Sequence, residues 1–172
     1  MSESVNWAEV GPLAQSAVET WHRGLADDRR DRARLRRAQG VDDVFEIDAY
    51  HRLRFGLARA GAGSWAAGNP TILGRVALAV AAIDADTGVS GDGACPTLGA
   101  ALAGLSKARL RLIANTGEIE LFLRLLRGAM SMIHRSAPVW DTAETVRRWH
   151  HPDGRRTARR LLLINYNDKL VE

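Results

Sequence analysis

The chain has 172 residues, of which 46% are hydrophobic and 26% are charged. This is the composition of an ordinary globular protein, and it excludes wholesale disorder. The lone cysteine, Cys95, excludes the internal disulfide framework of small secreted domains.

The N-terminus lacks the basic-then-apolar pattern of a signal peptide. The longest weakly polar run, residues 76–83, is far shorter than the ~20 residues that a membrane span requires. We therefore expect a cytoplasmic protein that has no membrane partner.

The net charge is +4, and all 24 basic residues except Lys107 and Lys169 are arginines. A GC-rich genome also favours arginine codons, so only the placement of the arginines indicates function. Residues 106–160 hold 12 basic and five acidic residues (+7), residues 1–105 hold 11 and 13 (−2), and residues 161–172 hold one and two (−1). The second half is therefore the basic one, and a basic surface favours polyanions.

The first half of the chain shows helical spacing of apolar residues. A first helix is expected from Pro12 to a stop at Gly24. A second is expected over residues 27–38, where acids at the start and arginines at the end complement the helix dipole. Asp42 or Asp43 is expected to cap a third helix, whose apolar face extends to position 57.

Three glycines predict a loop over residues 59–68. Asn69 and Pro70 then predict the start of a helix that continues to Ile83.

A connector is expected after that helix, because glycines, aspartates and a proline interrupt the pattern over residues 86–96. This segment divides the chain into an N-terminal helical lobe, residues 1–85, and a basic C-terminal helical lobe, residues 97–172.

The C-terminal lobe is also predicted to be helical. Thr97 is expected to cap a short helix, and Ser106 a second one that includes Ile113. The longest helix is expected to start near Thr116 and to reach Ile133.

The end of the chain predicts two more helices. Asp141 and Glu144 have capping-box spacing before a helix that reaches Trp149. Residues 152–154 predict a turn, and the last helix includes Asn165. No segment shows the alternation of a strand. The sequence therefore predicts an all-α fold, a two-lobed bundle of about eight or nine helices.

Four clusters of basic side chains are candidates for phosphate contacts. The first is Arg34, Arg36 and Arg37 on the second helix. Asp31 can pair with Arg34 or Arg36 and so neutralise part of this cluster, so anion binding and a solvated, internally paired face stay equally open.

The second cluster is Lys107, Arg109 and Arg111, which the helical spacing spreads around the axis. It follows the expected cap at Ser106, where free backbone amides attract anions, and no acid occurs until Glu118. Binding is therefore favoured over a merely solvated face.

The third cluster is Arg124, Arg127 and Arg135 on the expected long helix. Arg124 and Arg127 are adjacent on its surface, and Glu120 precedes Arg124 by four residues, which allows an ion pair. Arg127 has no acid at the corresponding position, and it is the better candidate for a phosphate contact.

The fourth cluster, Arg155, Arg156, Arg159 and Arg160, contains two i,i+4 pairs of like charge. Such pairs repel each other unless an anion or an acidic partner surface supplies the counter-charge. This stripe is the best candidate binding surface in the chain, and a solvated helix face remains the alternative.

The five histidines do not have the spacing of metal ligands, and no motif for nucleotide hydrolysis or for an activated cysteine is present. We therefore expect no metal, no cofactor and no catalytic residue. A small metal-dependent hydrolase that uses His134, His150 or His151 stays open as a minor alternative.

A series of short motifs occurs in a characteristic order along nearly the whole chain. They are Trp21, RLRRA (residues 34–38), EIDAY (46–50), TLGAAL (97–102), KARLRLI (107–113), LRLLR (123–127), APVWD (137–141) and Trp149. In order and spacing these motifs resemble the CasB family, the small subunit of the type I-E CRISPR Cascade complex.

The resemblance implies a non-catalytic, two-lobed helical subunit that forms a homodimer within the complex. Such a subunit lies along the guide RNA–target DNA hybrid, holds the displaced DNA strand, and contacts the backbone and large subunits. The nucleic-acid-binding positions that it implies are Arg34, Arg36, Arg37, Arg109, Arg111, Arg127, Arg155, Arg156 and Arg159.

The main alternative is a helical protein-interaction adaptor whose arginines meet acidic protein surfaces rather than phosphates. Neutralising the arginines would separate the two, because an adaptor would lose its protein partner with no change in DNA binding.

Overall fold

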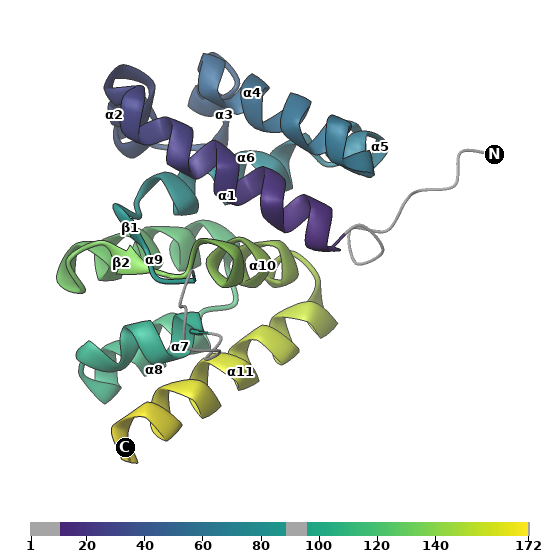
Figure 1. Ribbon diagram of the computed structural model, residues 1–172. Coiled ribbons are helices and arrows are strands. Elements are labelled where there is room, and N and C mark those ends of the chain that lie inside the picture. Colours follow the sequence, from purple (N-terminus) through teal and green to yellow (C-terminus); the bar gives the residue numbers. More distant parts are fainter. Residues whose placement is uncertain (1–10, 89–95, 172) are drawn as a thin grey trace. The chain divides into compact units, whose positions relative to one another are not determined.

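A computed structural model describes residues 11–88 and 96–171, and these residues are almost entirely helical. The chain forms two compact units, unit 1 (Met1–Ala81) and unit 2 (Ala82–Glu172), each with its own core (Figure 1). The predicted all-α helical bundle is confirmed. Within the described ranges no helix is both long and apolar enough to cross a membrane.

Unit 1 packs several helices around one mainly apolar helix, which is buried over its second half. Its elements are α1 (Gly11–Asp27), α2 (Arg29–Arg37), α3 (Val41–Val44), α4 (Asp48–Leu57), the π-helix η1 (Ala58–Ala62), α5 (Gly63–Gly68) and α6 (Pro70–Ala81). Helix α6 buries every residue from Val76 to Ala81. It contacts α2, α3 and α4, and these helices cover its apolar surface.

Three predictions for unit 1 are wrong at the level of single elements. Gly24 does not end helix α1, which continues to Asp27. A Cβ at position 24 would have no neighbour within 4 Å. Asp43 does not cap a long helix; its carboxylate accepts the amide of Gln39, and the backbone breaks between α3 and α4. The predicted loop over residues 59–68 is η1 and α5, where Gly61 takes a φ of 87° that lets the helix path continue through a kink.

Unit 2 is built around the long C-terminal helix. Its elements are β1 (Ala85–Asp86), α7 (Leu98–Ala101), the 3₁₀-helix η2 (Leu102–Gly104), α8 (Lys107–Asn115), α9 (Ile119–Met132), β2 (Ser136–Ala137), α10 (Val139–Trp149) and α11 (Pro152–Val171). Helix α11 packs on α7, α8 and α10. The two strands pair in parallel, with Ala85 opposite Ser136.

The core of unit 2 has two anchor points. Phe122 of α9 stacks on Trp149 of α10 with ring centroids 3.8 Å apart. Tyr166 of α11 is buried and donates its hydroxyl hydrogen to the carbonyl of Leu105 at 2.7 Å. Gly99 of α7 lies so close to α11 that a Cβ there would stand 2.7 Å from the carbonyl oxygen of Leu162. These contacts fix α11 in its place within the unit.

Two predicted caps in unit 2 are confirmed: Thr97 accepts the amide of Ala100, and Ser106 accepts that of Arg109. Other details differ. The longest helix is α11, with 20 residues, and not α9, with 14. Residues 152–154 form the first turn of α11, because proline suits a first helical position.

The predicted capping box at Asp141 is also wrong. Helix α10 begins earlier, at Val139, and the carboxylate of Asp141 instead accepts the amide of Leu98 at 2.6 Å, across the unit.

The predicted connector, residues 86–96, lies mostly outside the described residues, since 89–95 are not described. Unit 2 begins before it, at Ala82. The amides of Asp84 and Ala85, just before the predicted connector, donate to the carbonyl of Arg135, and these bonds attach them to unit 2. Cys95 lies outside the described ranges.

Candidate nucleic-acid interface

Two helices of unit 2 enclose a cleft of about 280 Å³. Its lining comes from α8 (Lys107, Leu110, Arg111 and Asn115) and from α11 (Arg159, Leu163, Tyr166 and Asn167). On α8, positions 107, 111 and 115 are four residues apart and therefore share one face. The buried side chains of Leu110 and Tyr166 form the apolar floor, and the cations stand above it.

A second hollow, of about 390 Å³, adjoins the cleft along α11. Its lining consists of Arg156, Arg159, Arg160, Leu163 and Ile164. Arg159 and Leu163 line both hollows, so the two adjoin along α11. Together they form a surface that we name the α8–α11 basic face, defined by Lys107, Arg111, Arg156, Arg159 and Arg160.

The helical spacing of α11 explains this placement. Arg156, Arg159 and Arg160 lie at i, i+3 and i+4, and Leu163 and Ile164 continue the same face one turn later. Opposite them, α11 buries Ala158, Leu162 and Tyr166 in the core. The buried positions therefore force the arginines outward.

The electrostatics of the α8–α11 basic face are poorly compensated. All five cationic residues are exposed. In the part of the chain that the structure describes, Lys107, Arg111 and Arg160 make no side-chain hydrogen bond or ion pair. Arg156 pairs with Asp153, but both side chains are about four-fifths exposed or more, at 79% and 88%, so this pair contributes little.

Two arginines of the α11 stripe are partly engaged within unit 2. Arg159 donates to the side-chain oxygen of Asn115 at 2.7 Å, and Arg155 donates to the carbonyl of Gly117. Arg155 is half-buried, so its guanidinium joins α11 to the segment after α8. The repulsion within the predicted like-charge pair Arg155 and Arg159 is therefore reduced by acceptors at and just after the end of α8.

Two further predicted residues lie outside the cleft. Arg109 is exposed on α8, and its Nη1 lies 3.4 Å from the sulfur of Met132 on α9. Arg127 is half-buried on α9. Burial lowers the pKa of the Arg127 guanidinium, and the nearby charge of Arg135 lowers it further.

The arginines predicted on α2 belong to unit 1 and are bound to backbone carbonyls there. The Nε of Arg36 donates to the carbonyl of Ala81, the last residue of α6, at 2.7 Å. Arg34 donates to the carbonyl of Glu46 at 3.1 Å. Arg37 is exposed and donates back to Ala33 of its own helix. The α2 cluster therefore has structural bonds that the sequence pattern did not reveal.

Lys107 and Arg160 line these hollows and belong to clusters identified from the sequence, although they are not among the positions that the resemblance implies. Each had a detectable signal, because Lys107 is four residues before Arg111, and Arg160 four residues after Arg156. What the sequence lacked was the packing of α8 against α11, which brings the two clusters to one cleft.

Within residues 11–88 and 96–171, no group of three or more His, Cys, Asp or Glu side chains is placed so that it could hold a metal ion. Of the three histidines of the hydrolase alternative, His134 and His151 are exposed and His150 is half-buried.

Comparison with known proteins identifies the family. A family model described as "CRISPR-associated protein Cse2 (CRISPR_cse2)" matches residues 31–166, which is well over half of the chain. A search of curated proteins found no match, and neither did a search of solved structures. The chain belongs to the Cse2 family, which implies that it is a subunit of a CRISPR Cascade complex, and the resemblance to CasB is confirmed.

Proposed function

We propose that this member of the Cse2 family is a non-catalytic subunit that binds nucleic acid through phosphate contacts of the α8–α11 basic face. Its ligands are the guide RNA–target DNA hybrid and the displaced DNA strand of a type I-E Cascade complex. The observation that carries the proposal is the convergence of cationic side chains from two helices, α8 and α11, on one cleft.

The chemistry of the cleft suits phosphodiesters. Arg111 and Arg160 can each present two parallel N–H donors to a phosphate, and Lys107 adds a point charge. The two hollows adjoin along α11, so successive phosphates of one strand can follow this helix. Leu163 and Ile164 offer apolar surface for the sugars between them.

The same cleft is poorly equipped to distinguish bases. Amide side chains are the usual readers of adenine, but the oxygen of Asn115 already accepts from Arg159. The amide nitrogen of Asn167 donates to the carbonyl of Leu163 at 2.6 Å. With one polar atom of each amide engaged, neither asparagine can make a two-bond contact with adenine, which favours sequence-independent backbone contacts by the cations.

Such contacts are sufficient for the proposed role. In guide-directed recognition, base pairing supplies the sequence specificity, and the exchange of DNA duplex for RNA–DNA hybrid is nearly balanced. A few phosphate contacts of about 1 kcal/mol each can then shift the balance toward the bound state. We further propose that the subunit acts as a homodimer and contacts the backbone and large subunits.

The experiment is a salt titration of binding to single-stranded DNA, duplex DNA and RNA of unrelated sequences. The variant Arg111→Ala/Arg156→Ala/Arg160→Ala is compared with the wild type and with Arg23→Ala/Arg29→Ala/Arg30→Ala, which removes the same charge from exposed positions of unit 1. We expect the first variant to lose about 100-fold in affinity for single strands, from three contacts of about 1 kcal/mol. The slope of log K against log salt should become shallower by about 2.

Equal losses in the two triple variants would indicate a nonspecific charge effect and contradict the proposal. Strong preference for one sequence would also contradict it, because phosphate contacts carry no base information.

The adaptor function is favoured by one separate observation on α8 and α9. Leu112 and Met132 are 58% and 46% exposed, and Arg109 contacts Met132. An apolar patch with one cation is typical of a protein contact rather than a phosphate contact. If Arg109→Glu abolishes incorporation into the complex and leaves DNA binding unchanged, Arg109 belongs to a protein interface.

A further inference from the structure

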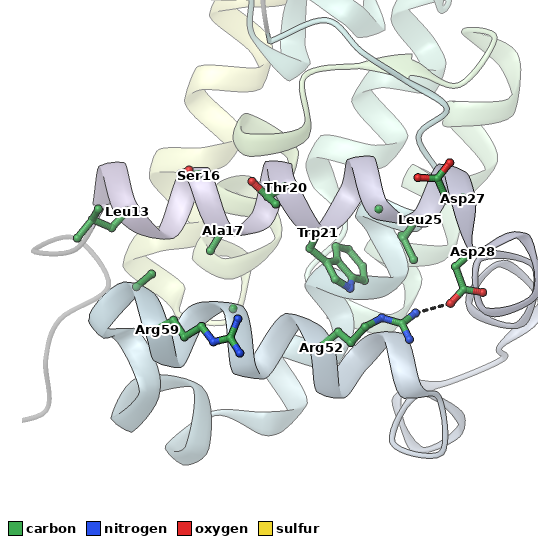
Figure 2. Close-up of a pocket in the computed structure, with 13 residues that line it drawn as sticks. Leu13, Ser16, Ala17, Thr20, Trp21, Leu25, Asp27, Asp28, Arg52 and Arg59 are labelled. Carbon is green, nitrogen blue, oxygen red and sulfur yellow. Dashed lines mark hydrogen bonds and ion pairs between the residues drawn. The ribbon is translucent and has the colours of Figure 1, made fainter.

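Unit 1 contains a groove that the proposed nucleic-acid contacts do not use. It has a volume of about 860 Å³ and runs between α1 and the α4–η1 segment (Figure 2). Side chains from Leu13 to Asp28 line it on α1, and Arg52, Gly56, Arg59 and Ala60 line it on the other side. A space of this size is that of a binding site.

The floor of the groove is made of small residues. Ala17 and Gly56 face each other, and a Cβ on Gly56 would stand 3.9 Å from that of Ala17. Thr20, Gly24 and Ala60 continue the small surface. Two helices that meet through small side chains leave a furrow above their contact, and the side chains of a third helix can fill such a furrow.

The walls of the groove are mainly apolar and its charges balance. Leu13 is 60% exposed at one end, and Trp21 and Leu25 contribute buried apolar surface further along. The four charged residues are Asp27, Asp28, Arg52 and Arg59, with a net charge of zero. A balanced, apolar lining does not attract a polyanion, so a nucleic acid is a poor occupant and a protein segment is a good one.

The charges are arranged with opposite signs at the two ends. Arg52 forms an ion pair with Asp28 at 2.5 Å (Figure 2) and a second one with the buried Asp31 at 3.2 Å, so its charge is already engaged within unit 1. This leaves Asp27 at the end of α1, and Arg59 opposite the half of α1 that begins with Leu13. Both are exposed, and neither has an ion-pair partner among residues 11–88 and 96–171.

We propose that the α1–α4 groove binds an amphipathic α-helix of a partner protein, whose N-terminus lies near Asp27 and whose C-terminus lies near Arg59. A helix carries partial positive charge at its N-terminus and partial negative charge at its C-terminus, so this direction matches both ends of the groove. The bound helix runs antiparallel to α1. From Leu13 to Asp27 the groove spans about 21 Å, or four turns of helix.

The mode of recognition follows from the shape. Apolar side chains of the partner at i, i+4, i+7 and i+11 enter the groove, and its polar face stays in water. An acidic residue in its last turn pairs with Arg59. This interaction involves only unit 1, so it does not depend on nucleic-acid binding by unit 2.

The probe is a fluorescent peptide of about 16 residues, with leucines at helical i, i+4, i+7 and i+11 spacing, lysine in its first turn and glutamate in its last. Its binding to the full chain is measured by polarisation. Ser16→Trp fills the groove, and Ala26→Trp places the same bulk on an exposed position of α1 that does not line it. Circular dichroism confirms that both variants are folded.

We expect Ser16→Trp to weaken peptide binding at least tenfold and Ala26→Trp to leave it unchanged. Arg59→Glu should weaken it about fivefold, and a peptide with lysine in the last turn should restore the loss. Absence of wild-type binding, or equal binding by the Ser16→Trp variant, would overturn the proposal. Because DNA binding by Ser16→Trp should stay at the wild-type level, this failure is distinguishable from failure of the nucleic-acid function.

Discussion

Two helices are rich in arginine, α2 in unit 1 and α11 in unit 2, and their arginines have different surroundings. On α2, Arg34 and Arg36 donate to carbonyls of other segments, at Glu46 and Ala81. On α11, Arg156 and Arg160 face outward beside a second cationic helix, α8. Density of arginine alone therefore does not identify a binding surface. We therefore base the proposed interface on the convergence of cations from two helices on one cleft.

The reason for the difference lies in what each helix covers. Helix α2 packs on α6, whose last carbonyls lack partners within their own helix, and an arginine side chain can supply the missing donor. Helix α11 packs on α7 through its opposite face, and Gly99 keeps that contact close. Its arginines therefore meet no helix end that would engage all of them.

The largest expected effect concerns the packing that positions α11. Gly99→Ala should destabilise unit 2 by about 3 kcal/mol, because the new Cβ would stand 2.7 Å from the carbonyl oxygen of Leu162 and 2.9 Å from the Cβ of Asn165. Gly128→Ala in α9 is the matched control, since nothing lies within 4 Å of its Cβ position. That variant should gain about 0.5–1 kcal/mol. Urea denaturation measures both, and equal stabilities would refute the tight packing of α7 on α11.

A smaller loss of stability is expected when single arginines of α2 are replaced. Arg36→Ala should cost unit 1 about 1–2 kcal/mol, because it removes the charged donor to the carbonyl of Ala81. Arg37→Ala should cost less than about 0.5 kcal/mol, since Arg37 is exposed and bonds only within its own helix. Denaturation of both variants checks the ranking, and a greater loss in Arg37→Ala would reverse the assigned roles.

The smallest effect is a contrast in pH dependence between two carboxylates. In unit 1, the amide of Asp31 and the charge of Arg52 hold the pKa of Asp28 below its ordinary value of 3.8. Its stabilising contribution is therefore present above that value and is lost as the pH falls through the lowered pKa. The stability difference between wild type and Asp28→Asn should shrink in acid.

In unit 2 the sign is opposite. Burial raises the pKa of Asp141 above 3.8, although the amide of Leu98 lowers it in part. The contribution of this group is fully present below its ordinary value and is lost as the pH rises through the raised pKa. The free energy of unfolding of the wild type, relative to that of Asp141→Asn, should therefore increase as the pH falls from about 7 to 3. Urea unfolding across this range measures both pairs, and parallel trends would contradict the assignment.

The sequence was sufficient for the fold class, because apolar spacing, Thr97 and Ser106 are local signals of helices. It failed where a local signal had two meanings. The glycines of residues 59–68 predicted a loop, yet Gly61 with its positive φ allows a kinked helix to continue. Asp141 looked like a cap, but its carboxylate bonds Leu98, 43 residues away in sequence. The two-residue strands are too short to show any alternation.

The candidate site was predictable in part for the same reason. The stripe on α11 follows from i,i+4 spacing, which the sequence displays. The cleft does not, because it exists only where α8 packs on α11. The internal bond of Arg36 to Ala81 joins residues 45 apart, and no local pattern reports it.

The most direct test of the account compares two double variants by the salt dependence of single-stranded DNA binding. One is Arg111→Ala/Arg160→Ala in the α8–α11 basic face, and the other is Arg34→Ala/Arg37→Ala on α2. We predict that the slope of the log binding constant for single-stranded DNA against log salt becomes shallower by about 1.4 for the first variant and stays at the wild-type value for the second. An equal decrease in both, or a decrease confined to the α2 variant, would contradict it.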